Sequence, residues 1–370
     1  MKPLACFVFA LGSAAIAQND VLYYKFEGGG NIAVNYAVNS PAPSSGPVIN
    51  TLTTAPTASF VNGQYGQALN GGIAQTPYQA NHVSTGWAPN VTGDYTWAMW
   101  LNNQRGNPGP SLTYLAGIPT SGAFRIYGGS STLLTVGNAG GSTYYRTIAN
   151  VYQMATAGWV HVAFVVDTVA MTTTYYINGV AEAPVALTAL PNIQGTEFNV
   201  GRQTLTNAPS IYDIDEFRFQ TRAASAAEVA FWASQHPAAD SAFASGCDAT
   251  LRSSNGLPQF SNFLYQFDVS AQVPNTFGLF AFGLQRAQSG PVALPLDLGT
   301  LLPGMSGCEW HCSADATTLM VLDGAGNGTV GFPILPDPAF DKFAFYVQGI
   351  FFGGPRGQMT TNPFSVVIGN

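Results

Sequence analysis

Two carboxylates alternate along one strand-like segment, and they are the first candidates for chemistry. In the segment Asp213-Ile-Asp215-Glu216-Phe217 the period of two in a strand places Asp213 and Asp215 on the same face. Retaining glycosidases use such a pair, with one carboxylate as nucleophile and the other as acid, about 5–5.5 Å apart. The next residue on that face is Phe217 and position 218 is arginine, so we expect no nucleophile–acid pair here.

A second candidate combines cysteine with histidine in Cys308-Glu-Trp-His311-Cys312. This segment offers at most three metal ligands, whereas a structural zinc site takes four, and its order is not that of the haem motif C-x-x-C-H. Cys247 would complete a Cys₃His set, but in an exported chain a disulfide is the favoured use of cysteine. Cys308 and Cys312 can bridge only across a turn, because four extended residues span about 13 Å. We predict a Cys247–Cys308 disulfide, while the sequence leaves the other pairings open.

A third group of residues has the chemistry of a sugar-binding surface, where aromatic rings and planar polar groups surround a groove. The residues that could lie on or near one such face are Trp100, Asn102, Arg105, Arg125 and Tyr127. A second aromatic–basic cluster is formed by Tyr144, Tyr145 and Arg146. The competing interpretation is that the aromatic residues are packing residues, which is the role we expect for Trp97.

The composition indicates that strands position these residues. The chain has 370 residues, enough for two domains with hydrophobic cores, and 46% of them are hydrophobic. Its 41 glycines and 24 prolines are typical of many short strands joined by turns.

The charge excludes two kinds of partner. Only 8% of the residues are charged, and the formal net charge is −7. Removal of residues 1–17 would take away one lysine and no acid, which gives (12 − 1) − 19 = −8. Nucleic acids and anionic membrane surfaces bind clustered lysine and arginine, and the sequence has no such cluster.

The first 17 residues have the three parts of a signal peptide. Met1-Lys2 is a positive start, residues 4–11 are apolar, and Ala15-Ile16-Ala17 is an A-x-A cleavage site before Gln18. The apolar run is much shorter than the roughly 20 residues that a membrane span needs, so an anchor is the weaker interpretation. We therefore expect a secreted or cell-surface protein without membrane insertion.

The strand pattern predicts two β-domains. Residues 18–236 contain the strand-like segments 95–101, 160–166, 172–177 and 214–219, and the Asn178-Gly179 pair after the third predicts a type I′ hairpin turn. The only convincing helix covers 226–234, where Ser225 and Glu228 form a capping box. Residues 237–245 are small and polar and are expected to be a linker. Residues 246–370 resume the strand pattern and predict a second, smaller β-sandwich.

The order of segments over about residues 21–232 resembles the laminin-G-like jelly-roll superfamily, which includes concanavalin-A-like lectins and glucanases. The segments that carry the resemblance are Tyr23-Tyr-Lys-Phe-Glu-Gly28, Gly63-Gln-Tyr-Gly-Gln-Ala-Leu-Asn-Gly71, Gly158-Trp-Val-His-Val-Ala-Phe164 with Tyr175-Tyr-Ile-Asn-Gly-Val180, and Asn199-Val-Gly-Arg202 with Ile214-Asp-Glu-Phe-Arg-Phe219. The resemblance implies an all-β, concanavalin-A-like jelly-roll sandwich. In the C-terminal part, the segments 246–247, 294–298 and 361–365 resemble a terminal module of secreted planctomycete-like proteins, which implies no function.

The resemblance also implies a metal and a set of alternatives for Asp215. Asp215 shares parity with Phe217 and Phe219, so we expect it to lean inward, and a buried carboxylate needs a partner. In this superfamily the partner is often calcium, for which Glu27 and Asp215 are the favoured ligands and Asn31 a weaker third. The alternative is that Asp215 accepts backbone N–H groups or pairs with a nearby arginine.

Three functions remain open at this stage. The first is a secreted, non-catalytic binding module that recognises a glycan or an extracellular protein. The second is a glycoside hydrolase with a diverged carboxylate pair, because glucanases of the superfamily use an E-x-D-x-x-E strand that residues 213–218 do not reproduce. The third is a purely structural component of the cell envelope.

Overall fold

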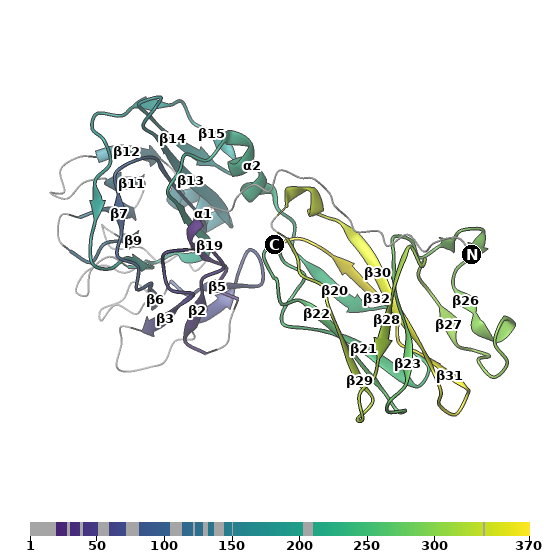
Figure 1. Ribbon diagram of the computed structural model, residues 1–370. Helices are drawn as coiled ribbons and strands as arrows, with labels where there is room; N and C mark the ends of the chain where they lie inside the picture. The colour runs from purple at the N-terminus through teal and green to yellow at the C-terminus, as the bar shows by residue number, and fades with distance from the viewer. Residues whose placement is uncertain are drawn as a thin grey trace. The chain divides into compact units, whose positions relative to one another are not determined.

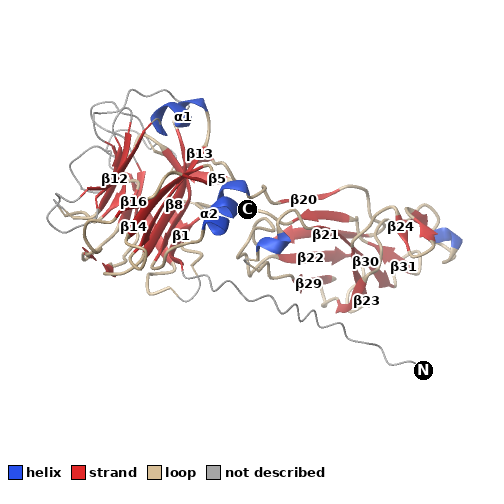
Figure 2. Cartoon of the chain, turned by 90° about the horizontal axis from the view of Figure 1, so that it is seen from above, coloured by secondary structure: helices blue, strands red, loops and turns tan. Residues whose placement is uncertain are grey.

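The computed structural model describes residues 20–27, 30–37, 40–50, 59–71, 81–103, 113–120, 123–128, 132–136, 144–149, 151–202, 210–335 and 337–370. Most of the elements in these ranges are strands, drawn in red in Figure 2. The chain divides into two compact units, one formed by Ala17–Ser234 and the other containing Gln235–Asn370. Each unit is described separately. The predicted signal peptide and Arg105 lie outside the described residues.

The N-terminal unit is a sandwich of two antiparallel sheets, and this confirms the predicted all-β jelly-roll fold (Figure 1). The first sheet has nine strands in the order β15-β14-β13-β8-β19-β5-β4, with β1 beside β19 and β16 beside β14. These strands are β1 (Asp20–Tyr24), β4 (Phe60–Asn62), β5 (Gln67–Leu69), β8 (Tyr95–Asn102), β13 (Val160–Asp167), β14 (Thr172–Ile177), β15 (Val180–Ala181), β16 (Val185–Ala186) and β19 (Asp213–Gln220).

The second sheet has eight strands in the order β12-β11-β10-β9-β18-β6-β3-β2. These are β2 (Ile32–Val34), β3 (Ser45–Asn50), β6 (Asn81–Ser84), β9 (Thr113–Gly117), β10 (Arg125–Gly128), β11 (Thr132–Val136), β12 (Tyr144–Ala149) and β18 (Asn199–Val200). A further pair joins β7 (Asn90–Val91) to β17 (Ile193–Gln194).

Strand alternation builds the core between these two sheets. In β8 the odd-numbered residues Trp97 and Met99 are fully buried in the core, as is Phe164 of β13. Val83 of β6 and Ile126 of β10, in the eight-stranded sheet, belong to the same core. The intervening residues of each strand point to its outward face, and that is where the candidate functional residues lie.

Two helices accompany the sandwich. The predicted helix is confirmed as α2 (Ala226–Ser234), and its capping box is formed: Glu228 N–H donates to Ser225 Oγ at 3.2 Å and Ser225 N–H donates to Glu228 Oε2 at 2.9 Å. Trp232 of α2 packs with Ala98 and Ala163 on the outward face of the nine-stranded sheet. A short helix, α1 (Val151–Ala157), was not predicted from the sequence, because its seven residues are too few for a clear helical period.

The C-terminal unit is a second sandwich, as predicted. A six-stranded sheet has the order β20-β32-β30-β23-β28 with β31 beside β30, and a three-stranded sheet has the order β21-β22-β29. These strands are β20 (Ala239–Ala242), β21 (Ala249–Ser254), β22 (Gln266–Ala271), β23 (Phe277–Gly283), β28 (Ala316–Val321), β29 (Asn327–Gly331), β30 (Ala344–Phe352), β31 (Gln358–Thr360) and β32 (Phe364–Val367). Phe267 lies at the centre of a group of phenylalanines that includes Phe280, Phe345 and Phe364.

The linker expected at 237–245 differs in the structure. It contains β20, in which Ala239 pairs with Val367 and Ala242 pairs with Phe364 of β32. The segment is small and polar because it is an edge strand with exposed side chains. Its partner strand lies near the end of the chain, so local composition could not show the pairing.

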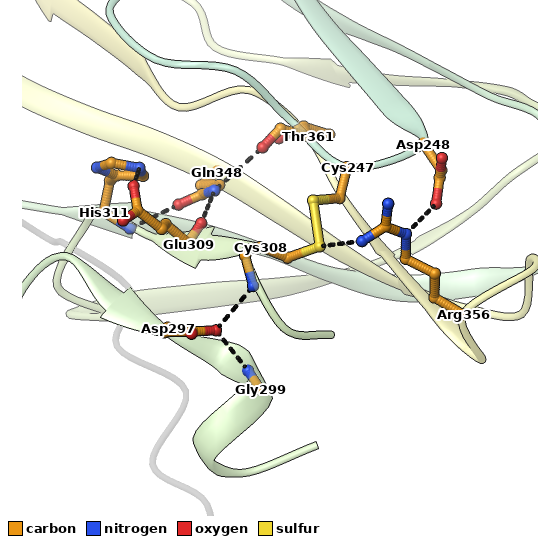
Figure 3. Close-up of a disulfide and its surroundings, with 11 residues drawn as sticks. Cys247, Asp248, Asp297, Gly299, Cys308, Glu309, His311, Gln348, Arg356 and Thr361 are labelled. Atoms are coloured by element: carbon orange, nitrogen blue, oxygen red, sulfur yellow. Dashed lines mark hydrogen bonds and ion pairs between the residues drawn. A yellow bond between two sulfur atoms is a disulfide. The ribbon is translucent and has the colours of Figure 1, made fainter. Parts of the chain in front are cut away.

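A disulfide ties the start of this domain to an excursion between β23 and β28, and it is the predicted Cys247–Cys308 bridge (Figure 3). The excursion holds β24 (Gln288–Ser289), β25 (Val292–Ala293), β26 (Leu296–Asp297), the 3₁₀ turn Leu298–Thr300 and β27 (Glu309–Trp310). Leu298 and Met305 pack around Cys308. Cys312 is the free, buried thiol, and burial, with the charge of Asp315, raises its pKa to about 12.

Candidate functional site

Charged side chains lie on the outward face of the nine-stranded sheet, beside β1 and β19, and all of them are buried except Glu27, which is half-buried. Together with the buried Tyr23 they form a group that we name the charged cluster, which consists of Asp20, Tyr23, Lys25, Glu27, Asp215, Glu216 and Arg218. Lys25 and Asp215 have no exposed surface at all. Because an isolated buried charge is very costly, each of these groups must find a partner within the protein.

A β-bulge at Glu216 decides which side chains enter the charged cluster. The pairing register of β19 with β8 shifts between Asp215 and Arg218, and Glu216 has a left-handed φ of 51°. The extra residue lets Phe217 face the core while Asp215 and Arg218 both face outward. The prediction that Asp215 shares a face with Phe217 and Phe219 is therefore wrong, because strict alternation fails at a bulge.

Asp215 is held by backbone donors. Its Oδ2 accepts the N–H of Tyr65 at 3.0 Å, and its Oδ1 accepts the N–H of Glu216 at 2.8 Å. This is the alternative with backbone partners that the sequence left open. Burial, and then the charge of Glu216, raises the pKa of Asp215 well above its usual range, even though these hydrogen bonds lower it.

The turn between β4 and β5 receives two carboxylates of the charged cluster. The N–H of Gln67 donates to Glu27 Oε1 at 3.0 Å, two residues beyond the N–H that binds Asp215. A Cβ on Gly63 would lie 2.6 Å from Asp215 Oδ2, and a Cβ on Gly66 would overlap the Glu27 carboxylate. Gly63 and Gly66 are thus needed for the close approach of these carboxylates, which the sequence alone did not reveal.

Tyr23 links the anions of the charged cluster to its cations. Its hydroxyl donates to Glu216 Oε2 at 2.5 Å, and its ring centre lies 3.6 Å from the guanidinium carbon of Arg218. Arg218 also forms an ion pair with Asp20 at 3.3 Å. Burial raises the pKa of Tyr23 well above its usual value, so the hydroxyl stays a donor.

Lys25 supplies the second cation, and it was not singled out from the sequence. It is the single lysine in residues 18–234. Its Nζ lies 5.3 Å from the ring centre of Tyr23 and 5.6 Å from that of Tyr36. Burial lowers the pKa of Lys25 to about 8, opposed first by the charge of Glu216 and then by that of Glu27 and other neighbours. The available signal was its position on the same face as Tyr23 in a buried strand.

The predicted calcium ligands are only partly brought together. Glu27 and Asp215 share the charged cluster, but Asn31 is exposed and its Oδ1 accepts the hydroxyl of Ser59. Among the described residues, no three histidine, cysteine, aspartate or glutamate side chains are arranged to hold a metal ion. The donor set does not fit calcium well, because backbone N–H groups already donate to both oxygens of Asp215 and to Oε1 of Glu27. Calcium stays a prediction.

The acidic strand does not present a catalytic pair. Asp213 and Asp215 share a face, as predicted, and that face points outward; Asp213 Oδ1 accepts the N–H of Gly71 at 2.9 Å. Asp215 and Glu216 are bound by the donors described above and are 0% and 4% exposed. These carboxylates serve as acceptors for the fold. The metal alternative for the Cys308–Cys312 segment is likewise lost, since Cys308 is in a disulfide.

The predicted sugar-binding residues do not lie on one face. Trp100 and Asn102 are on β8 of the nine-stranded sheet, whereas Arg125 and Tyr127 are on β10 of the eight-stranded sheet. The sequence shows strand parity but not which sheet a strand joins, and this is why the grouping was wrong. Trp100 is only 6% exposed and packs edge-on against Tyr65 and His161, so it is a packing residue.

The remaining two residues belong to an aromatic–arginine surface on the eight-stranded sheet, which we name the outward strip: Tyr114, Arg125, Tyr127 and Asn199. The rings of Tyr114 and Tyr127 are 5.6 Å apart, and the guanidinium carbon of Arg125 is 5.2 Å from the Tyr127 ring centre. Arg125 and Asn199 both pair with Gly117, which has no side chain to separate them. Among the described residues, neither Arg125 Nε nor Asn199 Oδ1 has a hydrogen-bond partner.

The N-terminal domain matches a known family model. Residues 76–230 match the model described as the Concanavalin A-like lectin/glucanases superfamily, Laminin_G_3. This match confirms the resemblance that the sequence motifs predicted. Among curated proteins no sequence matches the chain. The resemblance of the C-terminal part to planctomycete-like modules stays a prediction.

Solved structures of binding domains are similar to the chain. Domain 4 of a GH43 extracellular arabinanase from Geobacillus stearothermophilus, in complex with arabinotriose, is 20% identical and has a TM-score of 0.37, covering 50% of this chain and 88% of its own. The sialidase CBM40 from Ruminococcus gnavus, bound to α2,3 sialyllactose, is 14% identical with a TM-score of 0.32, covering 40% and 93%. The binding domain of Botulinum neurotoxin DC with rat synaptotagmin II is 8% identical with a TM-score of 0.43, covering 95% of both chains.

Replacing Gly66 tests the contact between the turn and Glu27. We expect Gly66→Ala to destabilise the N-terminal domain by at least ~2 kcal/mol, because the residue has a positive φ of 50° and its new Cβ would overlap the carboxylate. Gly93→Ala is the matched control, since nothing lies within 4 Å of its Cβ position. Chemical denaturation of both variants measures the difference. Equal stability of the two would contradict the described contact.

The buried His161 makes stability depend on pH. Burial, with the charge of Arg218, lowers its folded-state pKa to about 3, whereas an unfolded histidine takes up a proton below about pH 6.5. The unfolded state then binds more protons, so stability falls as the pH drops through this window. His161→Gln should remove about 2 kcal/mol of the loss between pH 7 and pH 5. His82 and Asp215 are present in both proteins, so their contributions to the pH dependence cancel when the two are compared. An unchanged pH dependence in His161→Gln would refute this prediction.

Proposed function

We propose that this chain is an exported, non-catalytic binding protein whose N-terminal domain recognises carbohydrate through the outward strip. The single observation that carries the proposal is the combination of paired tyrosine rings with two buried polar atoms, Arg125 Nε and Asn199 Oδ1, that have no hydrogen-bond partner among the described residues. Membership of a superfamily of lectins and glucanases supports it. The carboxylates of β19 support the non-catalytic part, because they accept hydrogen bonds within the fold.

The chemistry of the outward strip suits a sugar. A pyranose ring has apolar C–H faces that pack on an aromatic ring and hydroxyls that need hydrogen-bond partners at its edge. Tyr114 and Arg125 are half-buried and offer part of a ring and of a guanidinium, whereas Tyr127 and Asn199 are buried and support them. Gly117 has no side chain, so a ligand can approach the sheet between Arg125 and Asn199.

Export is proposed from the leader-like first 17 residues and agrees with the disulfide of the C-terminal domain. No helix in the described parts of the chain is long and apolar enough to cross a membrane. The second sandwich would act as a spacer or an anchor for the binding domain. A protein ligand is the other partner that this surface would fit, and the test below includes it as an outcome.

Glycan-array binding of the purified full chain tests the proposal. We expect binding to at least one glycan class, with a tenfold or greater loss of affinity in Arg125→Ala and Tyr114→Ala, which corresponds to about 1.4 kcal/mol or more. Arg252→Ala is the matched control, because this arginine is exposed on β21 of the other domain.

Two outcomes would count against the proposal. Absence of binding to any glycan would overturn carbohydrate recognition and leave a protein partner as the alternative. Binding that Arg125→Ala and Tyr114→Ala reduce no more than Arg252→Ala does would place the carbohydrate site elsewhere on the chain.

A further inference from the structure

We infer that the side-chain ammonium of Lys25 takes the place of a divalent cation among Glu27, Asp215 and Glu216, so that the N-terminal domain folds independently of calcium. The inference does not rest on the proposed function. It concerns the charged cluster, where the resemblance to a known superfamily implied calcium and the structure shows a buried lysine instead.

The position of Lys25 carries the first step. Its side chain is fully buried, and its Nζ lies 5.3 Å from the ring centre of Tyr23, whose hydroxyl donates to Glu216. The charges of Glu216, Glu27 and Asp215 raise the pKa of Lys25 against the effect of burial. These carboxylates come from two separate places in the chain: Glu27 follows β1, and Asp215 and Glu216 are successive residues of β19. One ammonium therefore faces anions that only the folded domain brings together, which is the task a bound cation would otherwise perform.

The carboxylate oxygens carry the second step. Calcium takes six to eight oxygen ligands at about 2.3–2.6 Å. Here both oxygens of Asp215 accept backbone N–H groups, Oε1 of Glu27 accepts the N–H of Gln67, and Oε2 of Glu216 accepts the hydroxyl of Tyr23. Too few oxygens remain to complete a calcium shell. A lysine ammonium needs fewer oxygen partners than calcium, because its three N–H donors are satisfied by a few acceptors.

The aromatic rings carry the third step. The Nζ of Lys25 lies 5.3 Å and 5.6 Å from the ring centres of Tyr23 and Tyr36. Ring faces attract an ammonium at such distances, and they provide none of the hard oxygen ligands that calcium requires. The surroundings of this position are therefore those of an organic cation. Removing the lysine charge should therefore destabilise the domain in a way that calcium does not repair, because the carboxylates lose their cation while their oxygens still accept N–H and O–H groups.

The experiment compares thermal midpoints of the full chain in calcium and in chelator. We expect no shift for the wild-type protein. Lys25→Ala and Lys25→Met should both have a lower midpoint than the wild type in both buffers, because each leaves the carboxylates without their cation. Calcium should restore neither midpoint, since the carboxylate oxygens still accept N–H and O–H groups. Lys342→Met is the matched control: this lysine is exposed, so its replacement should leave the midpoint unchanged.

Each result decides the question. A wild-type midpoint that rises with calcium and falls with chelator would overturn the inference, because it would show a metal site beside the lysine. So would a Lys25→Met midpoint equal to that of the wild type, because the carboxylates would then not need the ammonium. A midpoint of either Lys25 variant that calcium restores would also overturn it, because the carboxylates would then be able to hold the metal. If neither variant folds, the response of the wild type to calcium decides alone.

Discussion

The burial of opposite charges on the outward face of β1 and β19 is the constraint on which the N-terminal sandwich depends. Lys25 and Arg218 cannot be buried without the carboxylates around them, and these carboxylates cannot be buried without donors. The donors come from the backbone of the turn at 63–67 and from Tyr23. The charged cluster thus links β1, β19 and the turn between β4 and β5, which are distant in sequence.

Most of the fold was predictable because it follows from local patterns. Alternation of apolar residues defined the strands, the Asn178-Gly179 pair has the two positive φ angles of its hairpin, and Ser225 with Glu228 capped the helix. The linker was wrong because the strand at 239–242 is defined by a partner more than a hundred residues away. Local composition contains no information about such a pairing.

The candidate site was less predictable, for two physical reasons. The bulge at Glu216 breaks the period of two, so parity placed Asp215 on the wrong face beside Phe217. Sheet membership is a tertiary property, so the sequence grouped Trp100 with Arg125 although the two lie on different sheets. What the sequence did supply was the alternative that Asp215 accepts backbone N–H groups, because any buried carboxylate must have such a partner.

The two surfaces of the N-terminal domain therefore differ: charge on the nine-stranded sheet stabilises the fold, and the outward strip on the eight-stranded sheet is the surface that we propose for a ligand. The most direct measurement is amine labelling of the native chain followed by peptide mapping. The account predicts that exposed Lys342 reacts while fully buried Lys25 reacts only after denaturant is added. Labelling of Lys25 at the rate of Lys342 under native conditions would contradict a buried charged cluster.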